Sequence, residues 1–70
     1  MVTVYTQPRC QPCKATIRRL EERGVSYLVK EAAEHVDDLK ALGHSSAPVV
    51  VTGTAHWSGY RPDLIDEIPA

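Results

Sequence analysis

Two cysteines separated by two residues stand between a segment patterned as a β-strand and a segment patterned as a helix. Residues 1–6 alternate in the manner of a strand, and Cys10-Gln11-Pro12-Cys13 follows directly. Pro12 suits the first turn of a helix, because proline lacks the N–H that such a turn leaves unpaired. A second strand is expected at Val25–Val29, with Val25, Tyr27 and Val29 on one side. The sequence therefore predicts a right-handed β-α-β unit with two parallel strands and the cysteines at the start of its helix.

The first helix should bury one side and end at a glycine. Cys13, Ile17 and Leu20 recur at helical spacing, and Gly24 is placed to terminate the helix. A second helix is expected over about 33–42, where apolar residues also recur and Gly43 follows as a C-cap; its inward residues would be Val36, Leu39 and Leu42.

The second half of the chain predicts two more strands and a last helix. Val49–Val51 is apolar on both faces, as in a strand inside a sheet, and Ala55–Ser58 should return antiparallel to it after a turn. Pro62 opens a helix with three inward residues, Leu64, Ile65 and Ile68. The element order βαβαββα predicts an α/β fold, a four-stranded mixed sheet with three helices.

Length and composition limit the classes of function that this chain can have. Seventy residues make one domain, 1–70, and a 43% apolar and 24% charged composition is ordinary for a folded protein. The net charge of −1 argues against nucleic acid as a partner. The longest apolar run, Pro48–Val51, is too short to span a membrane, and the first residues do not resemble a secretory signal. We expect a cytoplasmic protein.

The cysteine spacing and position indicate thiol–disulfide chemistry. A cysteine at the start of a helix lies near unpaired N–H groups, which stabilise its thiolate and lower the pKa of the thiol. Cys10 is therefore the candidate nucleophile, and we expect its sulfur to be exposed and ionised. Cys13 is close enough to resolve the mixed disulfide that Cys10 forms. Arg9 and Lys14 flank the motif and would add positive charge.

Three other interpretations of the cysteines compete. They could form a static disulfide, although reducing compartments disfavour one, or they could be inert buried thiols. They could also ligate zinc, but no second cysteine pair is present, and the three histidines, His35, His44 and His56, lack ligand spacing. We predict no metal site. His44 and His56 are interpreted as surface residues.

Three segments resemble those of known redox proteins. The opening Val-Tyr-Thr-Gln-Pro-Arg-Cys-x-x-Cys resembles a glutaredoxin, and Ala47-Pro48-Val49-Val50 resembles the cis-proline segment of thioredoxin-fold proteins. The segment Trp57–Asp63 is similar to the W-S-G-F-R-P-D signature of the NrdH-redoxins, glutaredoxin-like proteins that behave as small thioredoxins. The resemblance covers nearly the whole chain.

The resemblance implies a specific electron route. Such proteins bind no cofactor; they take electrons from NADPH through thioredoxin reductase and pass them to a class Ib ribonucleotide reductase. Pro48 would be cis and lie beside the sulfurs, and the backbone at Ala47 and Val49 would pair with an extended segment of the partner. A monomer is expected. The residues implied to contact partners are Gln11, Pro12, Ala47, Pro48, Val49, Tyr60 and Arg61.

Departures from related patterns bear on the choice of reductant. Glutathione-using glutaredoxins usually carry Lys at the position of Gln7 and an acidic loop where this chain has 58–62, so Arg61 argues against tight glutathione binding. Lys is also common at the Gln7 position in NrdH-redoxins, and Gln11-Pro12 resembles thioredoxin's own motif. A glutathione-dependent glutaredoxin and a general protein disulfide reductase remain alternatives. A metal-binding module and a redox-regulated adaptor are non-enzymatic ones.

The signature segment has two possible roles. Trp57 could pack in the core or dock a partner, and Tyr60, beside Gly59 in a loop, is the better docking candidate. Arg61 and Asp63 could form a local ion pair that fixes the loop. The residues expected to support the active site are Arg9, Lys14, Trp57, Ser58, Gly59 and Asp63.

Overall fold

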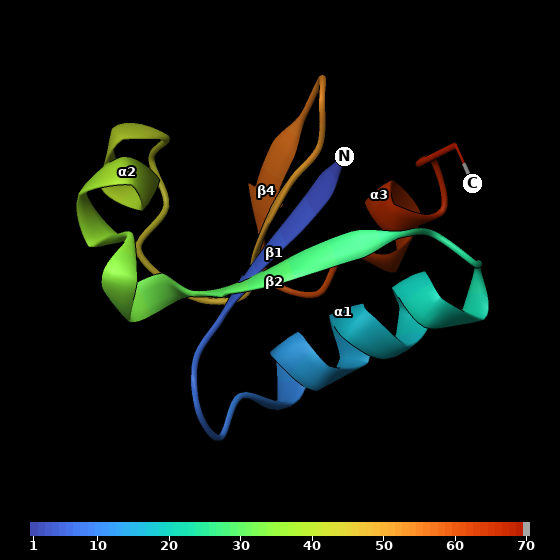
Figure 1. Ribbon diagram of the computed structural model, residues 1–70, viewed down its shortest axis with the longest axis horizontal. Helices are drawn as coiled ribbons and strands as arrows, with labels where there is room; N and C mark the ends of the chain where they lie inside the picture. Colours follow the sequence, from blue (N-terminus) through green and yellow to red (C-terminus); the bar gives the residue numbers. More distant parts are fainter. Residues whose placement is uncertain (70) are drawn as a thin grey trace.

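The computed structural model describes residues 1–69 and has a central four-stranded sheet with helices on both faces (Figure 1). The elements follow the chain as β1 (Val2–Thr6), α1 (Gln11–Glu22), β2 (Tyr27–Glu31), a 3-10 turn η1 (Ala32–Glu34), α2 (Val36–Ala41), β3 (Val49–Val51), β4 (His56–Ser58) and α3 (Pro62–Ile65). Their order confirms the predicted βαβαββα fold.

The sheet has the strand order β2-β1-β3-β4. β1 and β2 are parallel, as the β-α-β unit predicts, whereas β3 is antiparallel to both β1 and β4. β2 and β4 are therefore the edges, and β1 and β3 are central. None of the helices within residues 1–69 has the length and apolar character needed to cross a bilayer.

The main core lies between the sheet and the pair α1 and α3, which lie side by side in Figure 1. Leu20 of α1 and Ile65 of α3 are fully buried against one face of the sheet. The other buried residues of this core are Val2, Val4, Val25, Val50, Trp57 and Ile68. On the other face, α2 lies over Val49 and contributes one buried residue, Leu39.

Glycines end the first two helices as predicted. Gly24 (φ +70°) donates its N–H to the carbonyl of Glu21, and the N–H of Val25 donates to that of Leu20. Gly43 (φ +88°) closes α2 in the same way. Both are Schellman motifs, in which a left-handed residue lets the chain turn back and satisfy the last free carbonyls.

The second strand differs from its prediction. It spans Tyr27–Glu31 rather than 25–29, because the Schellman turn uses Val25 to close α1. Val29 pairs with Val4 and so points to the core face, but it is 51% exposed because β2 is an edge strand. The predicted second helix is also wrong in extent: it breaks at His35 (φ −133°) into η1 and a six-residue α2.

The inward face of α2 is narrower than predicted. At 100° per residue, Val36 and Leu42 lie about 60° to either side of Leu39 around the helix axis. Leu39 is buried, whereas Val36 and Leu42 are 45% and 41% exposed. Only the middle residue of the predicted apolar set therefore faces the sheet.

Ion pairs connect α1 to the end of α3. Arg19 donates two hydrogen bonds to Asp66, at 2.9 and 2.6 Å, and Arg23 donates to the carbonyls of Ile65 and Ile68 at 2.6 and 2.7 Å. The hydrogen bond from Arg19 holds the pKa of Asp66 below its ordinary value of 3.8.

We expect an Asp66→Asn variant to be slightly less stable than the wild type near neutral pH. Because the pKa of Asp66 is lower in the folded state, its contribution is complete above the unfolded pKa and is lost as the pH falls through the folded pKa. The difference in urea midpoint between wild type and variant should therefore narrow between about pH 5 and pH 2. Glu67→Gln is the control for loss of one exposed negative charge. A difference that stays constant down to the lowest pH would contradict the assignment.

Candidate functional site

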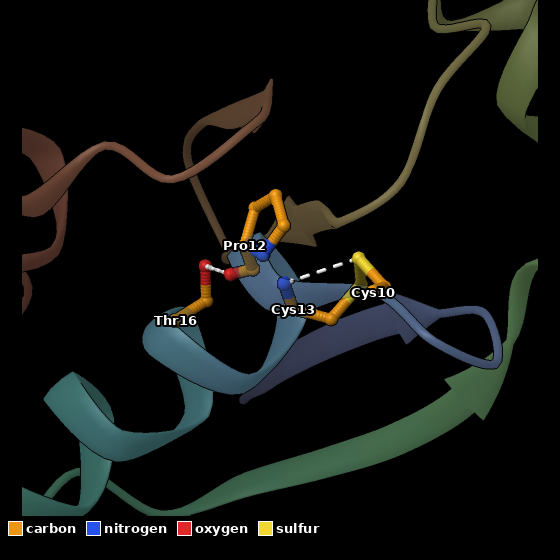
Figure 2. The surroundings of a disulfide bond; sticks show 4 residues. All are labelled: Cys10, Pro12, Cys13 and Thr16. Carbon is orange, nitrogen blue, oxygen red and sulfur yellow. Dashed lines mark hydrogen bonds between the residues drawn. A yellow bond between two sulfur atoms is a disulfide. The ribbon is translucent and has the colours of Figure 1, made fainter.

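Cys10 and Cys13 form a disulfide at the start of α1, with their Cα atoms 5.2 Å apart (Figure 2). Cys10 is the N-cap of the helix and has an extended backbone, while Cys13 lies in the first turn. The strand-to-helix connection thus places the two sulfurs within bonding reach of each other, which is what reversible dithiol chemistry requires.

The main chain of α1 supplies a donor to the first sulfur. The N–H of Cys13 donates a hydrogen bond of 3.1 Å to Sγ of Cys10, drawn as a dashed line in Figure 2. Pro12 is the second helical residue and has no N–H. Among the first three helical positions, only Gln11 and Cys13 therefore have an N–H that the helix itself leaves unpaired. A thiolate released at Cys10 would meet this N–H and the positive end of a 12-residue helix.

Thr16 is a supporting residue that sequence reasoning missed. It is fully buried, and its hydroxyl donates a hydrogen bond of 2.8 Å to the carbonyl of Pro12 (Figure 2). This bond fixes the first turn, which carries both sulfurs. The four-residue spacing between Pro12 and Thr16 is the signal that could have identified it, because helical threonines commonly bond the carbonyl four residues earlier.

The sulfurs are less accessible than expected. The prediction of an exposed Cys10 is wrong: Cys10 is 6% exposed and Cys13 is 3% exposed in the disulfide form. The N-cap conformation turns the Cys10 side chain back over the first turn, where it bonds to Cys13. Around them Arg9, Gln11, Pro12 and Lys14 are all exposed and form the rim of the site.

The segment before β3 lies at the same end of the sheet as the cysteines. Val49 pairs with Tyr5 in antiparallel register, so Pro48 lies beside the carboxyl end of β1, from which the chain leads to Cys10. The peptide bond between Ala47 and Pro48 is cis, as the resemblance implies. The carbonyl of Pro48 accepts a hydrogen bond of 2.8 Å from the N–H of Gly59.

Val49 does not match its predicted role. It lies inside the sheet, paired with Tyr5 on one side and Ser58 on the other, so its backbone faces strands in both directions. Ala47 lies before the strand and outside its pairing. Ala47 also borders a cavity of about 230 Å³ on the α2 face, whose other lining residues include Gln7, Val36 and Leu39. Backbone pairing with a partner is thus possible at Ala47, not at Val49.

The signature segment divides between core and surface. Trp57 is 7% exposed and packs in the main core, so it is not a docking residue. Its indole Nε1 has no hydrogen-bond partner among residues 1–69. Tyr60 is 41% exposed. Arg61 donates two hydrogen bonds to Asp63, at 3.1 and 2.9 Å, and these hold the pKa of Asp63 below its ordinary value.

Comparisons with known proteins agree with this geometry. The glutaredoxin family model matches residues 2–57. The glutaredoxin-like protein NrdH of Salmonella typhimurium is 41% identical over 73 residues, covering 96% of this chain and 86% of the relative. The NrdH protein of Escherichia coli is 39% identical over 70 residues with the same coverage.

A solved structure supports the same relationship. NrdH-redoxin from Escherichia coli, described as a glutaredoxin-like protein with a thioredoxin-like activity profile, superposes with a TM-score of 0.90 and 38% identity. The match covers 99% of this chain and 96% of that one. Sequence, fold and cysteine motif agree: the chain belongs to the glutaredoxin family, among its NrdH-type thiol–disulfide oxidoreductases.

Proposed function

We propose that this protein is a dithiol electron carrier in which Cys10 is the nucleophile and Cys13 the resolving thiol. The Cys10 thiolate attacks one sulfur of a target disulfide, forming a mixed disulfide and releasing the other target sulfur as a thiolate. Cys13, deprotonated, then attacks Sγ of Cys10, which forms the Cys10–Cys13 disulfide and releases the second target thiol. Two electrons and two protons pass to the target in each cycle.

The hydrogen bond from the Cys13 N–H to Sγ of Cys10 is the observation that carries this proposal. It is a donor aimed at the sulfur on which negative charge must develop, and it stabilises the thiolate both as attacking group and as leaving group. An inert or purely structural cysteine pair has no need of such a donor at a helix N-terminus.

We further propose that NADPH supplies the electrons through thioredoxin reductase and that a class Ib ribonucleotide reductase receives them. The related NrdH-redoxin is described as thioredoxin-like in its activity profile, which favours this reductase over glutathione. The Arg61–Asp63 pair supports the same choice. The carboxylate of Asp63 could otherwise attract the amino group of glutathione, but both of its oxygens already accept hydrogen bonds from Arg61. Such a carrier operates in a reducing compartment, so we propose that it is cytoplasmic. We also propose that it acts as a monomer.

Partner recognition would use the surface beside the disulfide. An extended segment of the partner can pair with the backbone of Ala47, and one of its apolar side chains can enter the adjoining cavity. Tyr60, exposed on the loop that bonds to Pro48 through Gly59, is the aromatic residue best placed to anchor the partner.

A reductase-preference assay tests the proposal. Oxidised protein is mixed with NADPH and either thioredoxin reductase or glutathione with glutathione reductase, and reduction of insulin disulfides is followed. We expect turnover with thioredoxin reductase at least about tenfold faster than with glutathione, a ratio that needs only about 1.4 kcal/mol of discrimination. Cys10→Ser provides the baseline without turnover.

The alternative outcomes have definite meanings. Faster turnover with glutathione identifies a glutathione-dependent glutaredoxin, the function that the family match alone would also allow. A class Ib ribonucleotide reductase then replaces insulin as the electron acceptor in the same assay. Turnover with insulin but not with this enzyme identifies a general disulfide reductase. No turnover with either system rejects the electron-carrier proposal.

A further inference from the structure

Two histidines that are distant in the sequence meet on the surface outside the disulfide site. Nε2 of His44 and Nδ1 of His56 are hydrogen-bonded at 2.8 Å, and the rings are nearly perpendicular, with centroids 4.9 Å apart. The fold thus supplies the proximity that sequence spacing did not indicate. The third histidine, His35, lies elsewhere, with its ring against Tyr5 and its Nδ1 near Asp38.

The main chain fixes both members of the pair. The N–H of His44 donates a hydrogen bond of 2.9 Å to the carbonyl of Leu39, as part of the Schellman motif that ends α2. His56 is held in β4 by its antiparallel pairing with Val51. Two imidazoles held on rigid backbone positions lose little conformational freedom when they bind one ligand together, which favours chelation.

The separation of the two nitrogens matches a particular coordination geometry. Nitrogens 2.8 Å apart, each about 2.0 Å from one metal ion, subtend an angle of about 90° at that ion. This is the angle between neighbouring ligands in square-planar and octahedral complexes. A tetrahedral zinc ion would need the nitrogens about 3.3 Å apart.

We propose that His44 and His56 form a bidentate site for a divalent late transition-metal ion with tetragonal geometry, Cu²⁺ first and Ni²⁺ second. Imidazole nitrogens suit these ions, which prefer square-planar or tetragonal coordination, and Cu²⁺ binds such sites most strongly. Both facing nitrogens must present a lone pair to the ion, so the ring protons move to Nδ1 of His44 and Nε2 of His56, and the rings turn out of their mutual hydrogen bond. His56 is exposed and has room to turn. Within residues 1–69 no three candidate ligands gather at one point, so water completes the coordination.

The test uses the untagged, disulfide-oxidised protein, in which neither cysteine has a thiol that can bind metal. Cu²⁺ is titrated calorimetrically into the wild type, His44→Gln, His56→Gln and, as the matched control, His35→Gln. Loss of a partner that merely orients a metal ligand typically costs about 10–100-fold in affinity, so loss of a ligand should weaken binding at least about tenfold. We expect this loss in both pair variants and unchanged binding in His35→Gln.

Electron paramagnetic resonance of the Cu²⁺ complex gives a second readout. The wild type should show two equatorial imidazole nitrogens and each pair variant only one. Wild-type binding no tighter than that of either pair variant, an equal loss in His35→Gln, or a wild-type spectrum without two imidazole nitrogens would each overturn the proposal. Thermal melts in the presence of a chelator show whether each variant is folded. Because no turnover is measured, the result is independent of the electron-carrier function.

Discussion

A Cys13→Ser variant is expected to stop after the first half of the reaction and to accumulate as a disulfide-linked complex with its target. Serine keeps the backbone N–H that donates to Sγ of Cys10, so attack by Cys10 remains possible. The resolving sulfur is gone, however, and only an external thiol can release the target. Intramolecular attack has an effective concentration far above that of millimolar thiols, so turnover should fall by at least about a thousandfold.

Non-reducing gel electrophoresis and mass spectrometry after mixing with a disulfide substrate measure the trapped complex. Cys10→Ser is the matched control and should form no complex, because the sulfur that carries the attack is absent. Addition of dithiothreitol should dissolve the Cys13→Ser complex. Normal turnover by Cys13→Ser, or equal trapping by the two variants, would refute the assigned roles.

A Leu20→Ala variant is expected to lose much of the stability of the fold. The side chain of Leu20 is fully buried, and it packs in the main core between the sheet and helices α1 and α3. Removal of a buried leucine side chain costs about 2–5 kcal/mol, because apolar contacts are lost and a cavity remains. In a domain of this size that loss lowers the melting temperature by about 10 °C or more.

Leu28→Ala is the control with the same chemical change at an exposed position. Leu28 is 48% exposed on the edge strand β2, and we expect its truncation to change stability by no more than about 0.5 kcal/mol. Urea unfolding of the reduced and the oxidised protein measures both variants. Equal effects at the two leucines would show that the core does not lie where the structure places it.

Local patterns in the sequence were sufficient for most of the fold. Alternation in β1, helical spacing from Cys13 to Leu20 and the glycine after α1 each act over a few residues, and the structure confirms all three. The cysteine motif belongs to the same class, because its position relative to strand and helix is also local. The parallel pairing followed from the handedness of the β-α-β unit.

Features that depend on distant neighbours were predicted less well. The pattern in β2 could not show that this strand would be an edge, and Val29 is therefore exposed although its side was correctly assigned. Val49 was assigned to partner binding because of its position after Pro48, but its exposure to a partner depends on β1 and β4. The contact between His44 and His56 arises only when the end of α2 meets β4.

The last helix depends on the first one for its conformation. α3 has four residues, and a helix this short is not stable in isolation because its nucleation is unfavourable. Its end is held by Arg19 and Arg23, which lie more than forty residues earlier in the chain. The loop that must close before these contacts form includes most of the chain. We infer that α3 becomes helical only when it docks on α1, so its helical conformation is coupled to the tertiary structure of the whole domain.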